Sequence, residues 1–237
     1  MTGLTPPRII AIVPARGGSK RIRGKNLLPI GGRPLLGHSL RHAREARAVS
    51  ETWVSTDDPR IAALAAGEGA RVVERPPDLA SDTATSESAL LHVLDARRAL
   101  GLEDPDLVVF LQATSPARRK GDIDDAVETF VREAADSLVS ACETRRFIWR
   151  LTAAGLESVT YDYRRRQREQ DMPRQFEENG SIYVFPPELL RRTGNRLGGR
   201  IAVYEMDYWS SFQIDSPEDA ELCEWIMRRP EFGGTPA

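Results

Sequence analysis

The chain has 237 residues, of which 41% are hydrophobic and 29% charged, and its net charge at pH 7 is −2. This composition is typical of one large globular domain, and the absence of a basic excess argues against nucleic acid as a bulk partner. No apolar run is long enough to span a bilayer, and we expect no signal peptide or membrane partner. Cys142 and Cys223 lie far apart in apolar surroundings, so we expect buried thiols in a cytoplasmic protein.

The first predicted element is a strand over residues 9–14, an apolar run without polar alternation that we expect to be buried on both faces. A loop rich in Gly, Ser, Arg and Lys follows it, from Arg16 to Lys25. Gly17 and Gly18 allow a ligand to approach the backbone, and the cations favour an anion. The spacing matches neither the P-loop nor the dinucleotide-binding motif. The alternative is a basic surface turn after a core strand.

Strands and helices alternate over the next part of the chain. We expect helices at 34–47, 59–67, 87–100 and 123–134, and strands at 52–57, 71–75, 106–112 and 137–143. Pro59 suits a first helical position, and Asp122 is a candidate helix cap. The alternation predicts a parallel sheet with helices on both faces, in which ligands bind at the carboxyl ends of the strands. The loops at 16–25, 55–58, 75–86 and 112–118 belong to that edge.

The alternation stops after Glu143. Residues 147–151 and 158–161 predict a hairpin, and residues 164–174 form a charge-dense segment that is either a solvated linker or a clamp for an acidic substrate. Strands are expected at 181–185 and 201–206. Ser216, Pro217 and Asp219 predict the capping box of a last helix that reaches about residue 229.

The predicted site suits transfer of a phosphoryl or nucleotidyl group. No motif of nucleophilic catalysis is present. A basic Gly-rich loop that faces carboxylates fits nucleotide phosphates with Mg²⁺, which prefers one or two carboxylates plus phosphate oxygens and water. Asp215, where a strand meets a helix, is a candidate metal ligand or a simple turn acid.

Seven short motifs occur in order along the chain. They are VPARGGSK at 13–20, KNL at 25–27, VSTD at 54–57, RPPDLASDT at 75–83, LQATSP at 111–116, ENGSIY at 178–183 and ID at 214–215. Each is weak alone, but together the pattern resembles the CMP-N-acylneuraminate (CMP-sialic acid) synthetases, also called acylneuraminate cytidylyltransferases. The resemblance covers about residues 8–228.

The resemblance implies an α/β fold of the Rossmann-like nucleotidyltransferase (glycosyltransferase-A) type with a mostly parallel central sheet. Residues 1–237 would form a single domain, in which an insertion at about 145–171 serves as a dimerisation arm, so a homodimer is expected. The implied reaction joins CTP and a nine-carbon 2-keto sugar acid, gives the CMP-sugar and pyrophosphate, and requires Mg²⁺. The anomeric hydroxyl would attack the α-phosphorus in line.

The resemblance also implies roles for individual residues. Arg16, Lys20 and Asp215 would be catalytic, with Asp215 the metal ligand. The nucleotide site would comprise Ala15, Arg16, Gly17, Gly18, Ser19, Lys20, Asn26, Arg75 and Ser86. The acceptor site would comprise Gln112, Thr114, Ser115, Arg168 and Gln170.

Two positions depart from the family pattern. The family usually has Asp-Ile-Asp where this chain has Gln213-Ile214-Asp215, so a second carboxylate must come from elsewhere, with Asp219 a candidate, or be replaced by water. Glu169 stands where many members carry an Arg for the sugar carboxylate, and Arg168 is a candidate substitute. These departures leave open an enzyme that uses a small phosphonate acceptor and, in another class, a catalytically silent nucleotide-binding module. No residue forces cytosine over uracil.

Overall fold

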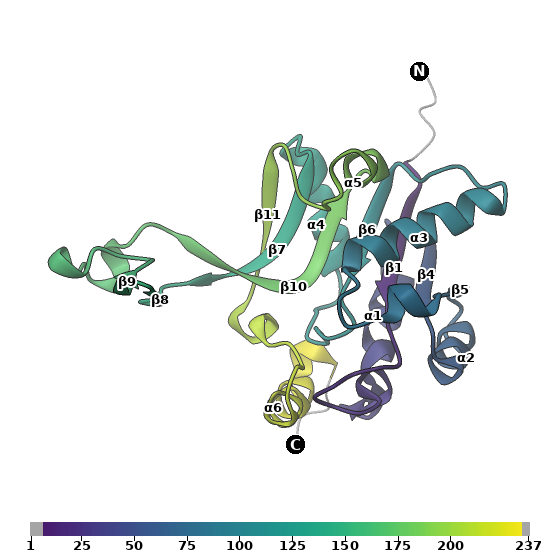
Figure 1. Ribbon diagram of the computed structural model, residues 1–237, viewed down its shortest axis with the longest axis horizontal. Coiled ribbons are helices and arrows are strands. Elements are labelled where there is room, and N and C mark those ends of the chain that lie inside the picture. Colours follow the sequence, from purple (N-terminus) through teal and green to yellow (C-terminus); the bar gives the residue numbers. More distant parts are fainter. Residues whose placement is uncertain (1–6, 234–237) are drawn as a thin grey trace.

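A computed structural model describes residues 7–233 of the chain; the expectations for residues 1–6 and for the last four residues lie outside this range. A seven-stranded sheet forms the centre, in the order β11-β7-β10-β6-β1-β4-β5 (Figure 1). Strand β10 is antiparallel to both neighbours, and the other pairings are parallel. The predicted α/β fold with a mostly parallel sheet is confirmed. The strands are β1 (Ile9–Pro14), β4 (Glu51–Thr56), β5 (Arg71–Glu74), β6 (Leu107–Leu111), β7 (Ser137–Thr144), β10 (Gln175–Phe185) and β11 (Ile201–Met206).

Helices cover both faces of the sheet. Helices α1 (Leu35–Glu45), α2 (Pro59–Gly67) and α4 (Asp122–Arg132) pack on one face, and α3 (Ser86–Ala99) and α5 (Pro187–Thr193) on the other. Strand β1 lies between them, with Ile9, Ala11 and Val13 in the first core and Ile10 and Ile12 in the second. Burial of alternate side chains on both faces explains why this segment carries no polar alternation.

A third apolar cluster lies below the sheet, around α6 (Pro217–Met227) and the short hairpin of β2 (Pro29–Ile30) and β3 (Arg33–Pro34). The predicted capping box of α6 is present, because the Ser216 side chain accepts from the Asp219 N–H and the Asp219 carboxylate accepts from the Ser216 N–H. Short 3₁₀ helices complete the fold: η1 (Lys25–Leu27), η2 (Pro77–Ala80), η3 (Tyr163–Arg165), η4 (Glu169–Asp171), η5 (Tyr208–Ser211) and η6 (Pro230–Phe232).

Three local predictions differ from the structure. Asp122 does not cap α4; Gly121 does, with φ of 100°, and the Asp122 carboxylate accepts from the Arg119 N–H instead. Strand β10 begins at Gln175 rather than at residue 181, because it continues along β7 past an irregularity near Glu178. No helix was expected at α5, which is short and begins with Pro187.

An extended arm projects from the ends of β7 and β10 (Figure 1). Its tip holds the antiparallel pair β8 (Trp149–Thr152) and β9 (Gly155–Ser158). The predicted hairpin is therefore present, but its second strand lies three residues earlier than the predicted range 158–161. In the described part of the chain, no helix has the length and apolar character needed to cross a membrane.

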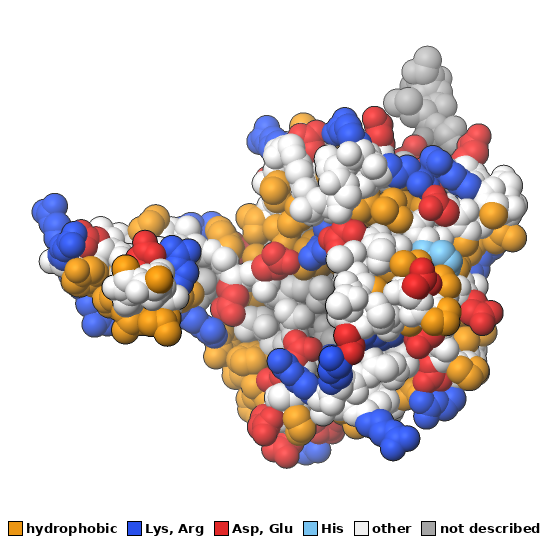
Figure 2. All heavy atoms as spheres, viewed as in Figure 1, with side chains coloured by type: hydrophobic (Ala, Val, Ile, Leu, Met, Phe, Trp, Pro, Cys, Tyr) orange, Lys and Arg blue, Asp and Glu red, His pale blue; other side chains and the backbone are white. Residues whose placement is uncertain are grey.

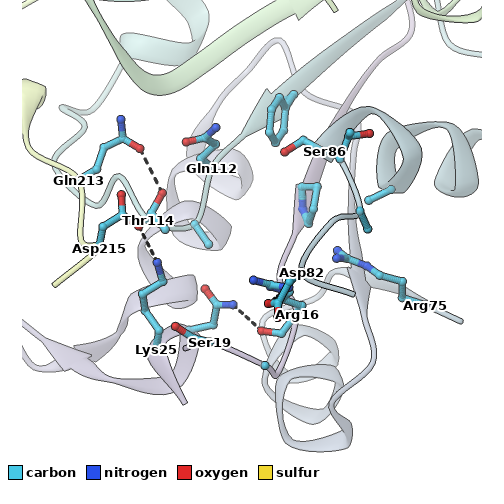
Figure 3. A pocket seen from close by; sticks show the side chains of 18 residues that line it. Arg16, Ser19, Lys25, Arg75, Asp82, Ser86, Gln112, Thr114, Gln213 and Asp215 are labelled. Atoms are coloured by element: carbon cyan, nitrogen blue, oxygen red, sulfur yellow. Dashed lines mark hydrogen bonds and ion pairs between the residues drawn. The ribbon is translucent and has the colours of Figure 1, made fainter. Parts of the chain in front are cut away.

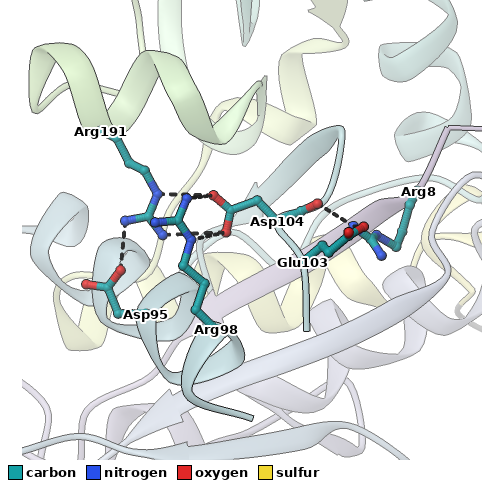
Figure 4. A network of polar contacts seen from close by, with 6 residues as sticks. All are labelled: Arg8, Asp95, Arg98, Glu103, Asp104 and Arg191. Atoms are coloured by element: carbon teal, nitrogen blue, oxygen red, sulfur yellow. Dashed lines mark hydrogen bonds and ion pairs between the residues drawn. The ribbon is translucent and has the colours of Figure 1, made fainter. Parts of the chain in front are cut away.

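An ion-pair network joins α5 to α3 (Figure 4). The Asp104 carboxylate accepts from Arg98 at 2.7 Å and from Arg191 at 3.1 Å, and Arg191 also pairs with Asp95 at 2.7 Å. Arg8, just before β1, donates to the Asp104 carbonyl. These pairs tie α5 to the helix whose N-terminus reaches the pocket.

Candidate active site

A pocket of about 330 Å³ opens at the carboxyl ends of the parallel strands (Figure 3). Pro14 ends β1, Arg75 follows β5 and Gln112 follows β6, and all three line it. Asp215 enters from the segment that leads into α6. The loops that the sequence assigned to this edge of the sheet therefore converge, as the parallel topology requires.

One end of the pocket is cationic. Arg16 lies 3.0 Å from a carboxylate oxygen of Asp82 and donates to the Ser81 carbonyl at 2.9 Å, while Lys20 pairs with Asp82 at 2.8 Å. The hydrogen bond from Lys20 and the nearby Arg16 charge lower the pKa of Asp82, so its carboxylate is charged at neutral pH. Asp82 thus lies between two cations, in a position where a phosphate group would make the same ion pairs.

Two short-range contacts hold the basic loop. The Gly17 N–H donates to Asp57 at 2.8 Å, and a Cβ on Gly17 would come within 2.7 Å of the Asp58 Cβ, which requires glycine there. The Asn26 amide donates to the Arg16 carbonyl at 2.9 Å. The cationic side chains therefore project from a backbone that is already fixed.

Arg75 and Ser86 form the wall next to α3. Arg75 is buried and donates to the Ser55 hydroxyl at 3.0 Å and to the Ser55 carbonyl at 2.7 Å, and burial lowers its pKa. Ser86 is the first residue of α3, whose N-cap Thr85 accepts from the Ser88 N–H. The helix N-terminus adds a partial positive charge to the pocket.

Asp215 is the candidate metal ligand at the opposite wall. Its carboxylate accepts from Lys25 at 2.9 Å, and Lys25 also donates to the Ile214 carbonyl at 3.0 Å. The Asp215 side chain is 54% exposed, so its second oxygen faces solvent-accessible space. A partly exposed carboxylate beside a group of cations fits Mg²⁺, which can take its other ligands from phosphate oxygens and water.

Asp219 does not supply the second carboxylate. Its Oδ2 accepts from the Asp215 N–H at 3.0 Å and from the Ser216 N–H at 2.8 Å, within the capping box. Between residues 7 and 233, no three acidic, His or Cys side chains form a metal-binding group. A metal ion would therefore depend on Asp215 and on the bound nucleotide.

The other end of the pocket carries neutral amides. Gln112 and Gln213 both line it, and the Thr114 hydroxyl donates to Gln213 Oε1 at 3.4 Å. Gly180, with φ of 60°, lies against both amides. The two ends thus differ in charge.

Buried polar groups support the amide end. Arg118 is fully buried and donates to the Gln112 and Ser181 carbonyls, both at 2.8 Å. Asn179 is also buried. Its side-chain amide donates to the Ser210 carbonyl at 3.1 Å, and its backbone carbonyl accepts from the Ser115 hydroxyl at 3.2 Å. These bonds hold the end of β6 against β10.

The structure brings most of the predicted site residues together. Those that line the pocket are Arg16, Gly18, Ser19, Asn26, Arg75, Ser86, Gln112, Thr114 and Asp215. Ala15 and Gly17 support the loop through their backbone, Lys20 reaches Asp82, and Ser115 is buried beneath the amide end. Arg168 and Gln170 lie in the exposed arm, where Arg168 pairs with Asp171 at 2.7 Å. The roles of all these residues remain predictions.

Nine residues that line the pocket were not among the predicted site residues: Pro14, Lys25, Asp82, Ala84, Thr85, Ala89, Phe110, Ala113 and Gln213. Lys25 and Asp82 lie inside the motifs, so their position was a usable signal. Phe110 looks like any core residue of a buried strand. Gln213 was noted only for the carboxylate it lacks.

Comparison with known proteins places these features in a family. The model of the family described as cytidylyltransferase matches residues 10–228. N-acylneuraminate cytidylyltransferase A of Danio rerio is 32% identical over 230 residues, which cover 95% of this chain and 52% of the relative. The chain spans about half the length of that protein. Post-translational flagellin modification protein B of Campylobacter coli is 28% identical over 226 residues, 93% of this chain and 95% of the relative.

Solved structures share the fold. A CMP:2-keto-3-deoxy-manno-octonic acid synthetase complexed with CTP has a TM-score of 0.70 at 19% identity, and the match covers 93% of this chain and 98% of the other. A 4-diphosphocytidyl-2C-methyl-D-erythritol synthase from Anaerococcus prevotii has a TM-score of 0.66 at 13% identity, covering 95% and 100%. The resemblance inferred from the motifs is confirmed.

Proposed function

Because the chain belongs to the cytidylyltransferase family, we propose that it transfers CMP from CTP to the anomeric hydroxyl of a sialic-acid-like nonulosonate and releases pyrophosphate. The main support is one pocket that has cations at one end and hydrogen-bonding amides at the other, and that Asp215 also lines, paired with Lys25. The named relatives that act on N-acylneuraminate also support it.

The basic loop would bind the triphosphate. On binding, Arg16 and Lys20 would exchange their contacts with Asp82 for contacts with phosphate oxygens. Lys25 adds a third positive charge next to Asp215. These charges offset the negative charge that develops as pyrophosphate leaves. The acceptor's hydroxyl must then reach the α-phosphorus from the amide end, opposite the leaving group. Holding both reactants in one pocket supplies most of what this reaction needs.

Asp215 would hold Mg²⁺, with phosphate oxygens and water as the remaining ligands. When bound, the ion neutralises charge on the triphosphate. Lys25 keeps the Asp215 side chain in position by its 2.9 Å contact, and the capping box fixes the backbone beneath it.

The arm supports the proposal of a homodimer. Its exposed apolar side chains include Trp149, Leu151, Leu156 and Val159, of which Leu151 is 79% exposed. Figure 2 shows hydrophobic side chains gathered on this projection. A second copy of the chain would cover this surface, and its arm would carry Arg168 and Gln170 toward the neighbouring pocket. The division of the chain into one domain with an arm at about 145–171, and the cytoplasmic location, also stay predictions.

The test is a panel of acceptors with CTP and Mg²⁺, read by pyrophosphate release. The panel contains N-acetylneuraminate, its deaminated form, legionaminate, pseudaminate, an eight-carbon 2-keto sugar acid and a small phosphonate. We expect turnover of at least one nonulosonate and none after EDTA treatment. Turnover of the phosphonate and of no nonulosonate would overturn the proposal.

Two further outcomes separate the remaining alternatives. Binding of CTP without pyrophosphate release from any acceptor would favour a silent nucleotide-binding module. A thermal-shift series with the four nucleoside triphosphates tests the choice of base, since a bound ligand stabilises the fold by mass action.

A further inference from the structure

Two walls of the pocket come from distant parts of the chain. The α3 wall contains Ser86, the first residue of α3, next to Arg75. The β10 wall lies at the amide end, where Gln112 lines the pocket and packs against Gly180 of β10. In the proposed reaction the nucleotide binds along the α3 wall and the acceptor along the β10 wall. The separation of the walls therefore determines how the two reactants meet.

One side chain contacts both walls. Arg196, in the segment between α5 and β11, donates from Nη1 to the carboxylate of Glu87, the residue after Ser86. Its Nη2 lies 3.6 Å from Oε1 of Glu178, two residues before Gly180. The Arg196 and Glu87 side chains are only 18% and 19% exposed, so salt screens this pair less than a surface pair.

The guanidinium of Arg196 also lies over two stacked aromatic rings. Its Cζ is 4.3 Å from the centre of the Tyr183 ring and 5.5 Å from that of the Phe110 ring. The two ring centres are 5.2 Å apart, and Phe110 lines the pocket. Because a cation is attracted to the face of an aromatic ring, the rings hold Arg196 in place together with the two carboxylates.

Tyr183 extends these contacts along β10. Its hydroxyl donates to Oε1 of Glu178, the same oxygen that faces Arg196, across the irregularity in β10 that contains Gly180. Burial and this hydrogen bond raise the pKa of Tyr183 to about 12, so the hydroxyl remains a donor at neutral pH. The path of β10 beside the amide end is therefore linked to the position of Arg196.

The segment that carries Arg196 is fixed by its own hydrogen bonds. The Leu197 N–H donates to the side-chain oxygen of Asn195 at 2.9 Å, and the Gly198 N–H donates to the Ser137 hydroxyl of β7 at 3.0 Å. The guanidinium thus projects from a turn that is attached to the sheet. A shift of one wall relative to the other would break one of its contacts.

We propose that Arg196 is a positioning residue that sets the separation of the α3 wall and the β10 wall and so aligns the acceptor with the α-phosphate of CTP. This inference rests on the proposed function. Without the guanidinium, Glu87 and Glu178 would be two like charges, one on each wall, and their repulsion would separate the walls. Each substrate would keep the contacts with its own wall, but the two reactants would no longer be in line.

Arg196→Gln tests this role, and Arg191→Gln is the matched control. Arg191 is 24% exposed and also joins α5 to the α3 region by ion pairs with two acids, Asp95 and Asp104, which do not line the pocket. We expect kcat with a nonulosonate to fall about 10- to 100-fold in Arg196→Gln, because a misplacement of about 1 Å can cost that much, and to stay within about twofold in Arg191→Gln. The KM values for both substrates should stay within about threefold of wild type in each variant.

Calorimetric titration with CTP separates misalignment from a loss of folded protein. Both variants should bind CTP with the wild-type stoichiometry, and thermal melting should show similar losses of stability in the two. If kcat of Arg196→Gln falls only in proportion to its CTP stoichiometry, or falls no more than that of Arg191→Gln, Arg196 serves stability alone and the proposal is wrong.

A double variant, Arg196→Gln with Glu87→Gln, tests the cause of the misalignment. Removing one of the two acids removes their repulsion, so we expect kcat to recover about fivefold or more from that of Arg196→Gln. A double variant with no recovery would overturn the proposal, because the loss would not act through the two carboxylates.

The same measurements separate the two levels of inference. A wild type that is inactive on every nonulosonate overturns the proposed function, and the role of Arg196 with it. An active wild type whose Arg196→Gln variant keeps the normal kcat overturns only the role of Arg196.

Discussion

The two ends of the pocket differ in the chemistry of their side chains. At the cationic end, which we propose binds phosphate and call the phosphate end, Arg16 and Lys20 share Asp82, and Lys25 holds Asp215, so each of these cations already has an acidic partner. At the amide end, Gln112, Gln213 and Thr114 are neutral and are held by hydrogen bonds from the backbone and from Arg118. To bind CTP, the phosphate end would have to exchange its ion pairs for phosphate oxygens. The side chains of the amide end are already held in place by hydrogen bonds.

Because of this difference, we expect substitutions at the two ends to affect ligand binding in different ways. Exposed ion pairs contribute about 1 kcal/mol or less each, so a triphosphate can displace them at small cost, and salt weakens them further. Hydrogen bonds around buried groups depend on geometry and cost more when they are disturbed. We therefore expect charge variants to act on CTP binding, and shape variants to act on the acceptor.

The largest effect is expected at the boundary between the two ends. Asp215→Ala removes the carboxylate that we propose holds Mg²⁺ between CTP and the acceptor, and we expect kcat to fall about 10²- to 10³-fold with a modest change in CTP affinity, because charge stabilisation acts mainly in the transition state. Steady-state kinetics and calorimetric CTP binding measure the two quantities.

The matched control is Asp219→Asn, at the neighbouring acid that caps α6. It should lower stability by about 0.5–1 kcal/mol and change kcat little, because its carboxylate bonds the backbone. An unchanged rate in Asp215→Ala would remove Asp215 from the mechanism. A comparable rate loss in Asp219→Asn would contradict its purely capping role.

At the amide end, Gly180→Ala is the shape variant. The added methyl group meets Gln112 Oε1 and Gln213 Oε1, so we expect kcat/KM for the acceptor to fall about tenfold or more, consistent with the loss of one to two oriented hydrogen bonds. Gly194→Ala is its control, because φ at Gly194 is 69° and a methyl group there meets open space. Both should lose stability through backbone strain, and only Gly180→Ala should lose acceptor turnover.

The contrast also explains what the sequence could predict. The motifs predicted most of the phosphate end, because Gly17, Gly18 and the cations lie within ten residues of one another. They follow a strand whose burial can be predicted from its apolar sequence. The amide end depends on contacts across long sequence separations, such as Arg118 with Ser181 and Thr114 with Gln213. Gln213 therefore looked like a defect in a motif. Its neighbour Gly180 was recognised only as part of the motif at 178–183.

The sheet shows the same division. Local periodicity predicted β1 and β6 almost to the residue, since each is a short buried strand. The antiparallel insertion of β10 between β6 and β7 was not predicted, because its register is set by partners more than 30 residues away in the chain. That strand carries Gly180, so missing its pairing concealed the acceptor side of the pocket.

The next prediction concerns the stability of the fold at acidic pH, which depends on buried histidines outside the pocket. His38 on α1 donates from Nε2 to the Ile30 carbonyl at 2.7 Å, and burial lowers the pKa of His38 from 6.5 to about 4, with Arg41, Arg33 and Arg118 adding to the effect. The unfolded chain therefore binds the proton first as pH falls below 6.5.

Stability should be highest above pH 6.5 and should fall by about 2 kcal/mol between pH 7 and pH 5 through His38 alone. His42, also buried with a lowered pKa, acts in the same direction. Urea unfolding at the two pH values measures the change, and His38→Gln should reduce it while keeping a donor for the Ile30 carbonyl. An equal pH effect in the variant would assign the loss to other groups.

The smallest effect is expected from Asp82→Asn, which tests the exchange of ion pairs at the phosphate end. Removing this carboxylate frees Arg16 and Lys20 for phosphate oxygens, so we expect the KM for CTP to fall about two- to fivefold at low salt, the scale of an exposed pair. The gain should shrink as NaCl is raised, because screening already weakens the competing contacts.

Glu133→Gln removes one negative charge at the end of α4 and is the control for net charge. It should leave the KM for CTP at the wild-type value under the same salts. If Asp82→Asn instead raises the KM for CTP, the carboxylate helps to bind the nucleotide or its metal ion. In that case the phosphate end would be arranged in advance like the amide end, and the contrast between them would be lost.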